Sequence, residues 1–405
     1  MTSESVAASF TRRSSAIAEW LAKNPWVGWA AWIVFCISIL VQTGPKRFGS
    51  TFSVYLDFAN RLWSRQPLYD ATTLDGFNYW PSSLLIYLPV IKLHPVVAGL
   101  VMITFAMAVF TWACVKLLDA LLPPERPVSA VTAAGILLMI NIPAAWFNFK
   151  YIQAQILMTS GMILGATAMM RGRWLLASLW IFLAAVMKPL AIVMLLLCGA
   201  VQPRMRLALI LALIAGFLLP FAFVEWSYMV EQYKTWMLKL SFMAHVMPTD
   251  WPYQADFQTM LDTFHIVVPP NVATAIRFAA AFGTLALAWR ISKIESRTIF
   301  PLAVLILSGC YITLFGPRNE FLSFFVLTPG LTALAFVLFG RDAQDIRGWL
   351  LIAAVLVLGF SVSFPVDRVT KPFVVTLIYL WLIWLTLDPQ RWRELLGEQA
   401  ANKSQ

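Results

Sequence analysis

Apolar stretches long enough to cross a lipid bilayer recur along most of this chain, separated by short connections that carry arginine, lysine or proline. A helix needs about 20 apolar residues to cross the ~30 Å hydrocarbon core. Inside lipid, every backbone amide and carbonyl must be hydrogen-bonded within the protein, so these stretches must be helical. Only 12% of the 405 residues are charged, whereas a soluble domain carries about 25%. The sequence therefore predicts an all-α polytopic membrane protein.

The stretches predict about 12 transmembrane spans. We expect residues 1–25 to precede the first span, residues 26–388 to form a single transmembrane domain, and residues 389–405 to be a tail. The spans are placed near residues 26–43, 96–118, 129–147, 152–170, 174–187, 189–201, 207–224, 272–290, 298–316, 321–339, 348–364 and 373–388.

Paired basic residues in the short connections predict the orientation, because Lys and Arg are enriched in cytoplasmic loops. One topology puts all of these pairs in the cytoplasm, together with both termini, and leaves the long loops 44–95 and 225–271 outside. We therefore expect an integral protein of the bacterial inner (cytoplasmic) membrane. The pairs are Arg171/Arg173, Arg204/Arg206, Arg290/Lys293/Arg297, Arg341/Arg347 and Arg391/Arg393.

Two stretches leave alternatives open. Residues 80–93 are apolar but short for a span and contain prolines, so we interpret them as a re-entrant or interfacial helix in the first outer loop. Residues 174–201 carry Lys188 and Pro189 in their middle. Proline removes a backbone donor, which favours two short helices that break near the outer face. A single long tilted helix is the alternative, and it would invert the loops between.

Several classes of chemistry lack their sequence signals. The net charge of +10 arises in the basic connections, so no nucleic-acid partner is expected. The three histidines, His94, His245 and His265, are dispersed without the spacing of a metal site. No Gly-rich nucleotide loop occurs. We therefore expect no metal and no cofactor, and the four cysteines, which lie in apolar stretches, are interpreted as small buried residues.

Charged residues near the outer side of the membrane are functional candidates, because ionisable groups at membrane depth are costly. Apolar residues at helical spacing predict an amphipathic helix over 52–63, with Asp57 and Arg61 on its other faces. At four residues apart these two form either a simple ion pair or part of a site. The predicted topology also places cations on this side, and they suit an anionic phosphate: Lys150, Lys188, Arg277 and Arg318.

Short motifs in this order resemble glycosyltransferase family 87, whose members include polyprenol-phosphate-mannose-dependent α-mannosyltransferases of the GT-C superfamily. The resemblance covers about residues 50–335. It rests on order and spacing, since each motif is short. The motifs are Val54-Tyr55, Leu68-Tyr69-Asp70, Phe77-Asn78-Tyr79-Trp80-Pro81, Leu88-Pro89, Gln153-Ala154-Gln155, Arg171-Gly172-Arg173, Lys188-Pro189, Asp256 to Leu261, and Gly316-Pro317-Arg318-Asn319-Glu320.

The resemblance implies a GT-C-like bundle of about 12 transmembrane helices, with amphipathic helices in the outer loops. It implies an inverting transfer of a hexose, with mannose as the first candidate, from a polyprenyl-phosphate donor to a lipid-linked or envelope glycan. The family's leading aspartate is Thr51 here. Asp57 is therefore the first candidate for the catalytic base, and Asp70 and Glu320 follow.

The other expected site residues fall into two groups. Lys188, Arg277 and Arg318 are expected to bind the donor phosphate. The expected sugar or acceptor contacts are Tyr55, Tyr79, Trp80, Gln153, Gln155, Gln258 and Asn319. Each aromatic residue by itself also fits an interfacial aromatic belt. A polytopic transporter or lipid-glycan flippase is the alternative function, and an assembly subunit without an active site is a further one.

Overall fold

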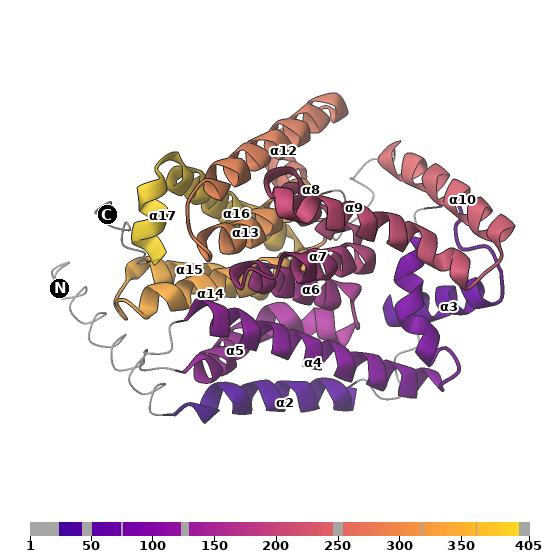
Figure 1. Ribbon diagram of the computed structural model, residues 1–405, viewed down its shortest axis with the longest axis horizontal. Coiled ribbons are helices and arrows are strands. Elements are labelled where there is room, and N and C mark those ends of the chain that lie inside the picture. Colours follow the sequence, from indigo (N-terminus) through magenta and orange to yellow (C-terminus); the bar gives the residue numbers. More distant parts are fainter. Residues whose placement is uncertain are drawn as a thin grey trace.

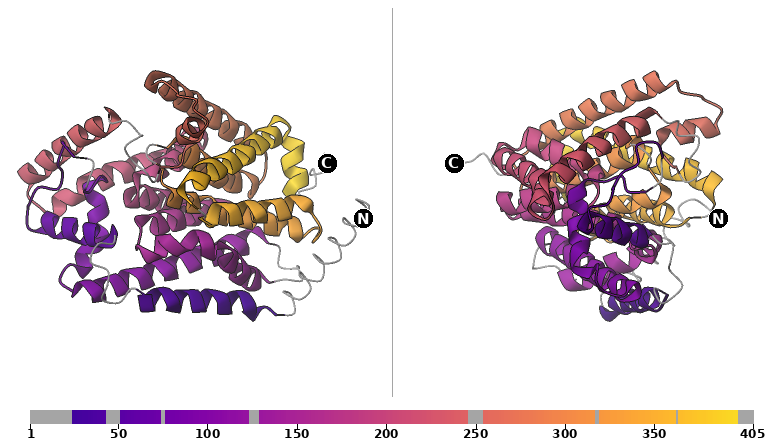
Figure 2. Two further views of the ribbon diagram at one scale, coloured as in Figure 1. Left: turned by 180° about the vertical axis from the view of Figure 1, so that it is seen from behind. Right: turned by 90° about the vertical axis from the view of Figure 1, so that its right-hand side faces the viewer.

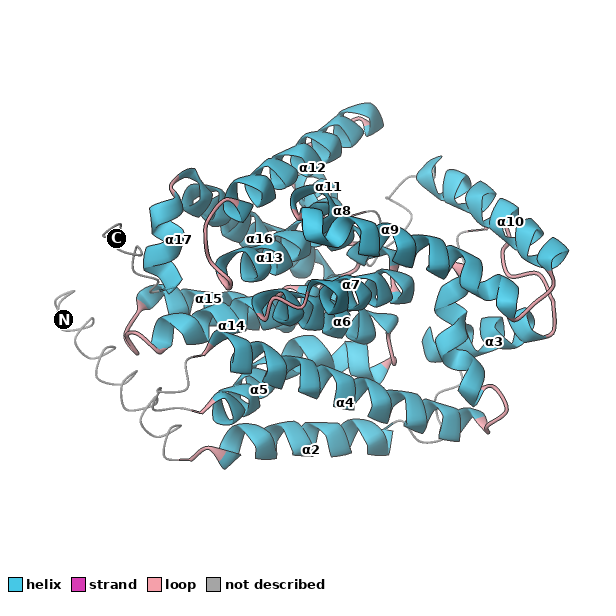
Figure 3. Cartoon of the chain, in the orientation of Figure 1, coloured by secondary structure: helices cyan, strands magenta, loops and turns pink. Residues whose placement is uncertain are grey.

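The structure of the protein, a computed structural model, describes residues 24–42, 51–73, 76–122, 129–245, 254–316, 319–361 and 363–396. Within these ranges the protein is all-α, and the one β feature is an isolated antiparallel bridge between Gln254 and Glu320. Most of the long helices run side by side through a single bundle (Figures 1 and 3).

Six segments of the described chain are long and apolar enough to cross a membrane. They are α4 (Pro95–Leu121), α5 (Ala130–Lys150), α9 (Pro203–Leu218) with the 3-10 turn η3 (Leu219–Ala222), α12 (Pro270–Ser292), η5 (Phe321–Val326) with α14 (Thr328–Phe339), and α16 (Phe364–Leu387). The shorter apolar helices are α2 (Trp26–Gln42), η1 (Pro81–Val90), α6 (Ala154–Met170), α7 (Trp174–Met187), η2 (Pro189–Ala191) with α8 (Ile192–Val201), α13 (Ile299–Phe315) and α15 (Ile346–Gly359). The chain is therefore an integral membrane protein, as the sequence predicts.

The remaining helices lie at the two ends of the bundle. Figure 1 shows α17 (Pro389–Leu396) at its left end, and α3 (Thr51–Trp63) and α10 (Trp226–His245) at its right end. Figure 2 shows the same separation from behind. We call the end that carries α3 and α10 the α3 end. The short helix α11 (Phe257–Thr263) packs against α16.

The centre of the bundle is formed by α6, α13 and α14, whose residues are buried on almost every face. Close packing here depends on small residues, which let helices approach within a membrane. A Cβ added at Gly161 would lie 2.9 Å from the Cβ of Ala184 on α7, and one at Gly165 would lie 2.5 Å from Cγ1 of Ile181. The spacing Gly-x-x-x-Gly thus fits α6 directly against α7.

The break between α7 and α8 confirms the first of the two predictions for residues 174–201. The α7 helix ends at Met187, and Lys188 is extended, with φ −146° and ψ 121°. The guanidinium of Arg204, which follows α8, lies 5.7 Å from the ring of Trp174, the first residue of α7. The chain therefore leaves and returns to the same end, as two short helices and not as one tilted helix.

The structure differs from the sequence prediction at α16. This helix begins at Phe364, whereas the span was predicted from residue 373. The intervening turns carry Asp367 and Lys371, whose charges lower the hydropathy, yet both side chains are buried. Residues 80–93, expected as a re-entrant or interfacial helix, form the 3-10 helix η1 against α3.

Candidate active site

The α3 helix is amphipathic because its apolar side chains recur every three to four residues. Phe52, Tyr55 and Leu62 are buried, whereas Asp57 on another face is exposed. The carboxylate of Asp57 pairs with Nε of Arg61 at 2.9 Å, and both side chains are about half exposed. The helical ion pair that the sequence left as one alternative is therefore present in the structure.

A cluster of aromatic rings lies between α3 and the segment that leads into η1. Tyr55 stacks on Tyr87, with ring centroids 5.3 Å apart, and lies 5.9 Å from the ring of Tyr79. Phe77 meets Tyr55 edge-on at 6.5 Å. Burial raises the pKa of Tyr55 well above its ordinary value, and Tyr79, Tyr87 and the charge of Glu320 raise it further. The Tyr55 phenol therefore remains protonated, and the Glu320 carboxylate lies within electrostatic reach of it.

Glu320 lies on the short connection between α13 and η5. It is half-buried and extended, with φ −83° and ψ 156°, and its backbone forms the antiparallel bridge with Gln254. Among the residues that the structure describes, no lysine or arginine lies within ion-pair distance of its carboxylate. Its carboxylate oxygens are therefore not engaged by a described cation and can accept a hydrogen bond from a substrate hydroxyl.

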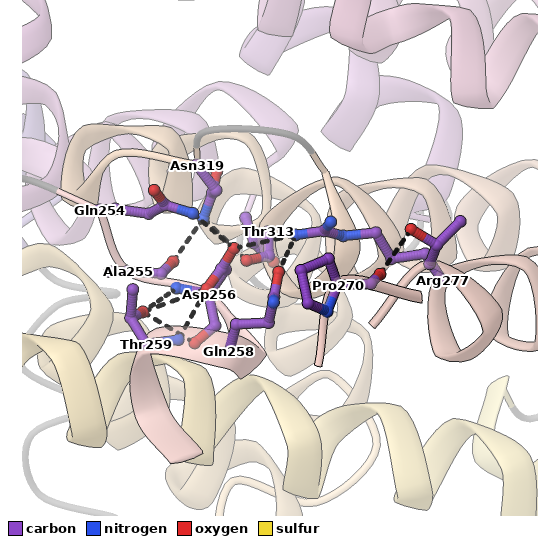
Figure 4. Close-up of polar contacts among 10 residues, drawn as sticks. Gln254, Ala255, Asp256, Gln258, Thr259, Pro270, Arg277, Thr313 and Asn319 are labelled. Atoms are coloured by element: carbon purple, nitrogen blue, oxygen red, sulfur yellow. Dashed lines mark hydrogen bonds and ion pairs between the residues drawn. The ribbon is translucent and has the colours of Figure 1, made fainter. Parts of the chain in front are cut away.

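The neighbouring Asn319 joins this connection to the second long loop. Its side chain is fully buried, and its Nδ2 donates to the carbonyls of Ala255 (2.8 Å) and Thr313 (2.7 Å). In return, the backbone amide of Ala255 donates to the carbonyl of Asn319 at 2.7 Å. Figure 4 shows these contacts in one view with the start of α11. Asn319, which directly precedes Glu320, thus holds the end of α13 and the loop before α11 together.

Asp256 is the other buried centre of this network. Its carboxylate accepts hydrogen bonds from Nε2 of Gln254 (2.8 Å) and from the backbone amide of Thr259 (2.9 Å). The Thr259 hydroxyl accepts from the Asp256 amide in turn, which completes a capping box at the start of α11. Asp256 is also 3.6 Å from Nη2 of Arg277 on α12. The network therefore links α11, α12 and the turn after α13 (Figure 4).

Arg277 is held in place from several sides. Besides Asp256, its Nη2 donates to Oε1 of Gln258, and its guanidinium lies 5.5 Å from the ring of Phe257. The side chain is still 26% exposed. A guanidinium that is anchored by neighbouring groups on a side chain that is not fully buried is suited to binding a phosphate group.

Buried amides surround η5, the helix that begins after Glu320. Nδ2 of Asn148 donates to the carbonyl of Leu322 at 3.1 Å, and Nε2 of Gln155 reaches the carbonyl of Ser323 at 3.5 Å. Nε2 of Gln153 donates to Thr51 at 3.0 Å and so connects the turn between α5 and α6 to α3. The contacts of Asn148 and Gln155 fix the position of η5 within the bundle.

Asp70, Trp80 and Lys188 form no hydrogen bond or ion pair with this network among the described residues. Asp70 is exposed, and hydrogen bonds from the hydroxyl and amide of Thr72 lower its pKa. Trp80 is buried 6.4 Å from Trp236 of α10. Lys188 is half-buried at the break after α7. Arg318 lies outside the described residues.

Sequence reasoning assigned no role to three buried charged residues near Glu320. Asp256 was named only within a motif, although an aspartate three residues before a threonine is a signal for a helix N-cap. Asp367, which accepts a hydrogen bond from Ser361, and Lys371, 5.5 Å from the Phe321 ring centroid, lie in the first turns of α16. Their four-residue spacing was the available signal. Among the described residues, no group of three His, Cys, Asp or Glu side chains forms a metal site.

Comparison with known proteins identifies a family. The model of glycosyltransferase family 87 matches residues 77–317, from the aromatic segment before η1 to the turn after α13. The matched region contains Lys188 and Arg277, begins after Tyr55 and ends before Glu320. No curated protein matches the chain.

Proposed function

This chain belongs to glycosyltransferase family 87, and on that basis we propose that it moves a hexose from a polyprenyl-phosphate donor to a lipid-linked or envelope glycan, with mannose as the first candidate. The proposed architecture is a GT-C-like bundle of about 12 spans, in which the shorter apolar helices cross the membrane with the longer ones. The proposed orientation puts the α3 end at the periplasmic or extracellular face and both termini in the cytoplasm.

The state of Glu320 is the observation that carries the proposed mechanism. A carboxylate that acts as a general base must be ionised and within hydrogen-bond reach of the acceptor hydroxyl. Glu320 is half-buried at a helix connection on the α3 end, and no described cation pairs with it. We propose that Glu320 accepts the proton of the acceptor hydroxyl as that hydroxyl attacks the anomeric carbon. The bond to the polyprenyl phosphate breaks in the same displacement, so the anomeric centre is inverted.

The donor phosphate leaves as an anion, and cations that are already in position stabilise the charge that develops on it. Arg277 is the first of these, because Asp256 and Gln258 orient its guanidinium while a quarter of the side chain stays exposed. Lys188 and Arg318 are proposed to assist it. Gln153, Gln155, Tyr55, Tyr79 and Trp80 remain proposed sugar or acceptor contacts.

Asp57 and Asp70 remain proposed as secondary candidates for the base. The carboxylate of Asp57 is paired with Arg61, and that of Asp70 is engaged by Thr72. Both are exposed to solvent and so lack the water-excluded surroundings that strengthen electrostatic effects in an active site. We therefore rank Glu320 before them.

A transfer assay tests the proposal. Purified protein in liposomes is given radiolabelled polyprenyl-phosphate-mannose, -glucose or -arabinose together with an envelope-lipid extract. We expect Glu320→Gln to lower the transfer rate by about 10²–10⁴-fold, which is the range for loss of a general base. Glu295→Gln is the matched control, because Glu295 is an exposed glutamate in the connection between α12 and α13.

Each outcome of the assay has a distinct meaning. Full activity in Glu320→Gln together with loss in Asp57→Asn or Asp70→Asn would move the base to that residue. If the folded protein transferred none of the three sugars, the glycosyl transfer proposed here would be wrong. Movement of labelled glycolipid across the liposome membrane in the same sample would then favour the flippase.

A further inference from the structure

Asn319 is fully buried, and both hydrogen bonds that its side chain donates run to backbone carbonyls, whereas its Oδ1 has no partner among the described residues. The sugar or acceptor contact that the sequence predicts at Asn319 stays a prediction. Both hydrogens of Nδ2 are used, one on Ala255 and one on Thr313. An asparagine in this situation fixes backbone geometry.

The geometry that it fixes belongs to Glu320. The carbonyl of Asn319 accepts from the Ala255 amide at 2.7 Å, and Glu320 forms the adjoining antiparallel bridge with Gln254. The Ser323 amide donates to the carbonyl of Glu320 at 2.8 Å and starts η5. The backbone of Glu320 is thus held on one side by the second long loop and on the other by η5.

The loop side of this arrangement is itself fixed by buried groups. Asp256 is 0% exposed and receives hydrogen bonds from Gln254 and Thr259 while it pairs with Arg277. The Gln254–Asp256 segment therefore has one defined position relative to α12. Because Ala255 and Asn319 are hydrogen-bonded to each other, the position of this segment also determines the position of the Glu320 backbone.

We propose that Asn319 is a positioning residue for the general base, which it aligns by joining the loop before α11 to the turn after α13. This inference rests on the proposed function, in which Glu320 is the base. A displacement of about 1 Å at a reacting group lowers a rate by roughly 100-fold. Loss of the Asn319 bridge should therefore slow the chemical step and leave donor binding almost unchanged.

The experiment compares Asn319→Ala with a matched control, Asn141→Ala. Asn141 is also fully buried, and its Nδ2 donates to the Leu137 carbonyl (2.8 Å) and the Thr332 hydroxyl (3.1 Å), within the bundle and between other elements. Both variants leave buried groups unpaired, so both should lower thermal stability. Only Asn319→Ala should lower kcat, by about 10–100-fold, with the KM for the labelled polyprenyl-phosphate donor changed less than about threefold.

A double-mutant cycle with Glu320→Gln separates positioning from a general loss of structure. If Asn319 acts through Glu320, Asn319→Ala should cost little further activity once Glu320 is replaced. Thr259→Val, which removes one half of the capping box and is milder, should show a smaller kcat loss of the same kind. Thr259→Val therefore tests the inference if Asn319→Ala fails to fold.

The outcomes distinguish this inference from the proposed function. Loss of activity in Glu320→Gln with unchanged kcat in Asn319→Ala would overturn the positioning role alone. Equal kcat losses in Asn319→Ala and Asn141→Ala, or equal costs with and without Glu320, would also overturn it. An active Glu320→Gln protein, or a parent protein that transfers no sugar, would show that Glu320 is not the base. The positioning role of Asn319 would then be wrong as well.

Discussion

At the scale of single residues, the α3 end contains side chains whose surroundings set their protonation state. Tyr55 is 4% exposed and Tyr69 6%, and burial is the largest cause that raises the pKa of each well above the ordinary value. The Tyr55 hydroxyl lies 3.5 Å from that of Tyr79, and the Tyr69 hydroxyl donates to the Tyr79 carbonyl at 2.7 Å. Tyr55 and Tyr69 therefore act as neutral groups in the folded protein.

Replacement of Tyr55 by Phe should reduce the sensitivity of the fold to alkali. An unfolded tyrosine ionises near pH 10, whereas the folded pKa of Tyr55 is higher. The stability contributed by its neutral form is thus complete below about pH 10 and is lost as the pH rises above that value. We expect the parent protein to lose thermal stability between pH 9 and pH 11, and Tyr55→Phe to lose less.

The measurement is thermal unfolding in detergent across that pH range, followed by tryptophan fluorescence. Tyr151→Phe is the control, because the ring of Tyr151 is only half-buried in the turn after α5. Identical pH dependence in all three proteins would show that ionisation of Tyr55 does not contribute to alkaline unfolding.

At the scale of helices, close contacts between backbones determine which elements pack together. The α2 and α5 helices approach at Gly28 and Gly135, and a Cβ at Gly28 would lie 2.4 Å from the Gly135 carbonyl carbon. The indole of Trp29 donates to the Val131 carbonyl at 3.0 Å across the same contact. Backbone atoms cannot rotate away as a flexible side chain does, so the two helices have no room for a larger residue.

Gly28→Ala should therefore push α2 away from α5. Overpacking of a well-packed contact costs about 1–3 kcal/mol, which we expect as a lower melting temperature in detergent. Gly283→Ala is the matched control, because a Cβ at Gly283 of α12 would meet nothing within 4 Å. Alanine is the better helix former by about 1 kcal/mol, so the control should be at least as stable as the parent. Equal stability of Gly28→Ala and the parent would contradict the close approach.

The sequence predicted elements better than it predicted their contacts. Apolar length located six long apolar helical segments, and Lys188-Pro189 located the break after α7, because both signals are local. The start of α16 was missed, since a hydropathy pattern excludes Asp367 and Lys371 even where they are buried. The roles of Lys188 and Arg277 remain predictions.

The network around Glu320 was beyond sequence reasoning for a different reason. Asn319 and Ala255 are 64 residues apart, and nothing local in either segment indicates that they meet. Sequence placed Gln258, Arg277 and Asn319 on one side of the membrane. The structure adds that Gln258 and Asp256 both contact Arg277, and that Asn319 holds the turn after α13 to the loop before α11. A polar residue in a loop can be recognised from sequence as a functional candidate, but its partner is determined by the packing of the whole bundle.

At the scale of the whole molecule, the basic connections gather at the end opposite α3. Arg171 after α6 pairs with Asp119 near the end of α4 at 2.6 Å, and Arg204 before α9 lies over Trp174. Arg341 donates to backbone carbonyls at the end of α17. Because positive connections stay in the cytoplasm, this arrangement predicts that the α17 end is cytoplasmic and that the α3 end faces outward.

Cysteine labelling in intact cells tests this orientation. Thr73 is exposed in the first long loop, and Gln344 is exposed in the connection between α14 and α15. A membrane-impermeant maleimide should modify Thr73→Cys in intact cells, and Gln344→Cys only after the cells are permeabilised. The native cysteines in the described helices are buried or half-buried, so the parent protein should give little background. The reverse pattern would place Glu320 and Arg277 on the cytoplasmic side, where nucleotide-linked sugars are made. A polyprenyl-phosphate donor used on the outer face would then no longer fit this protein.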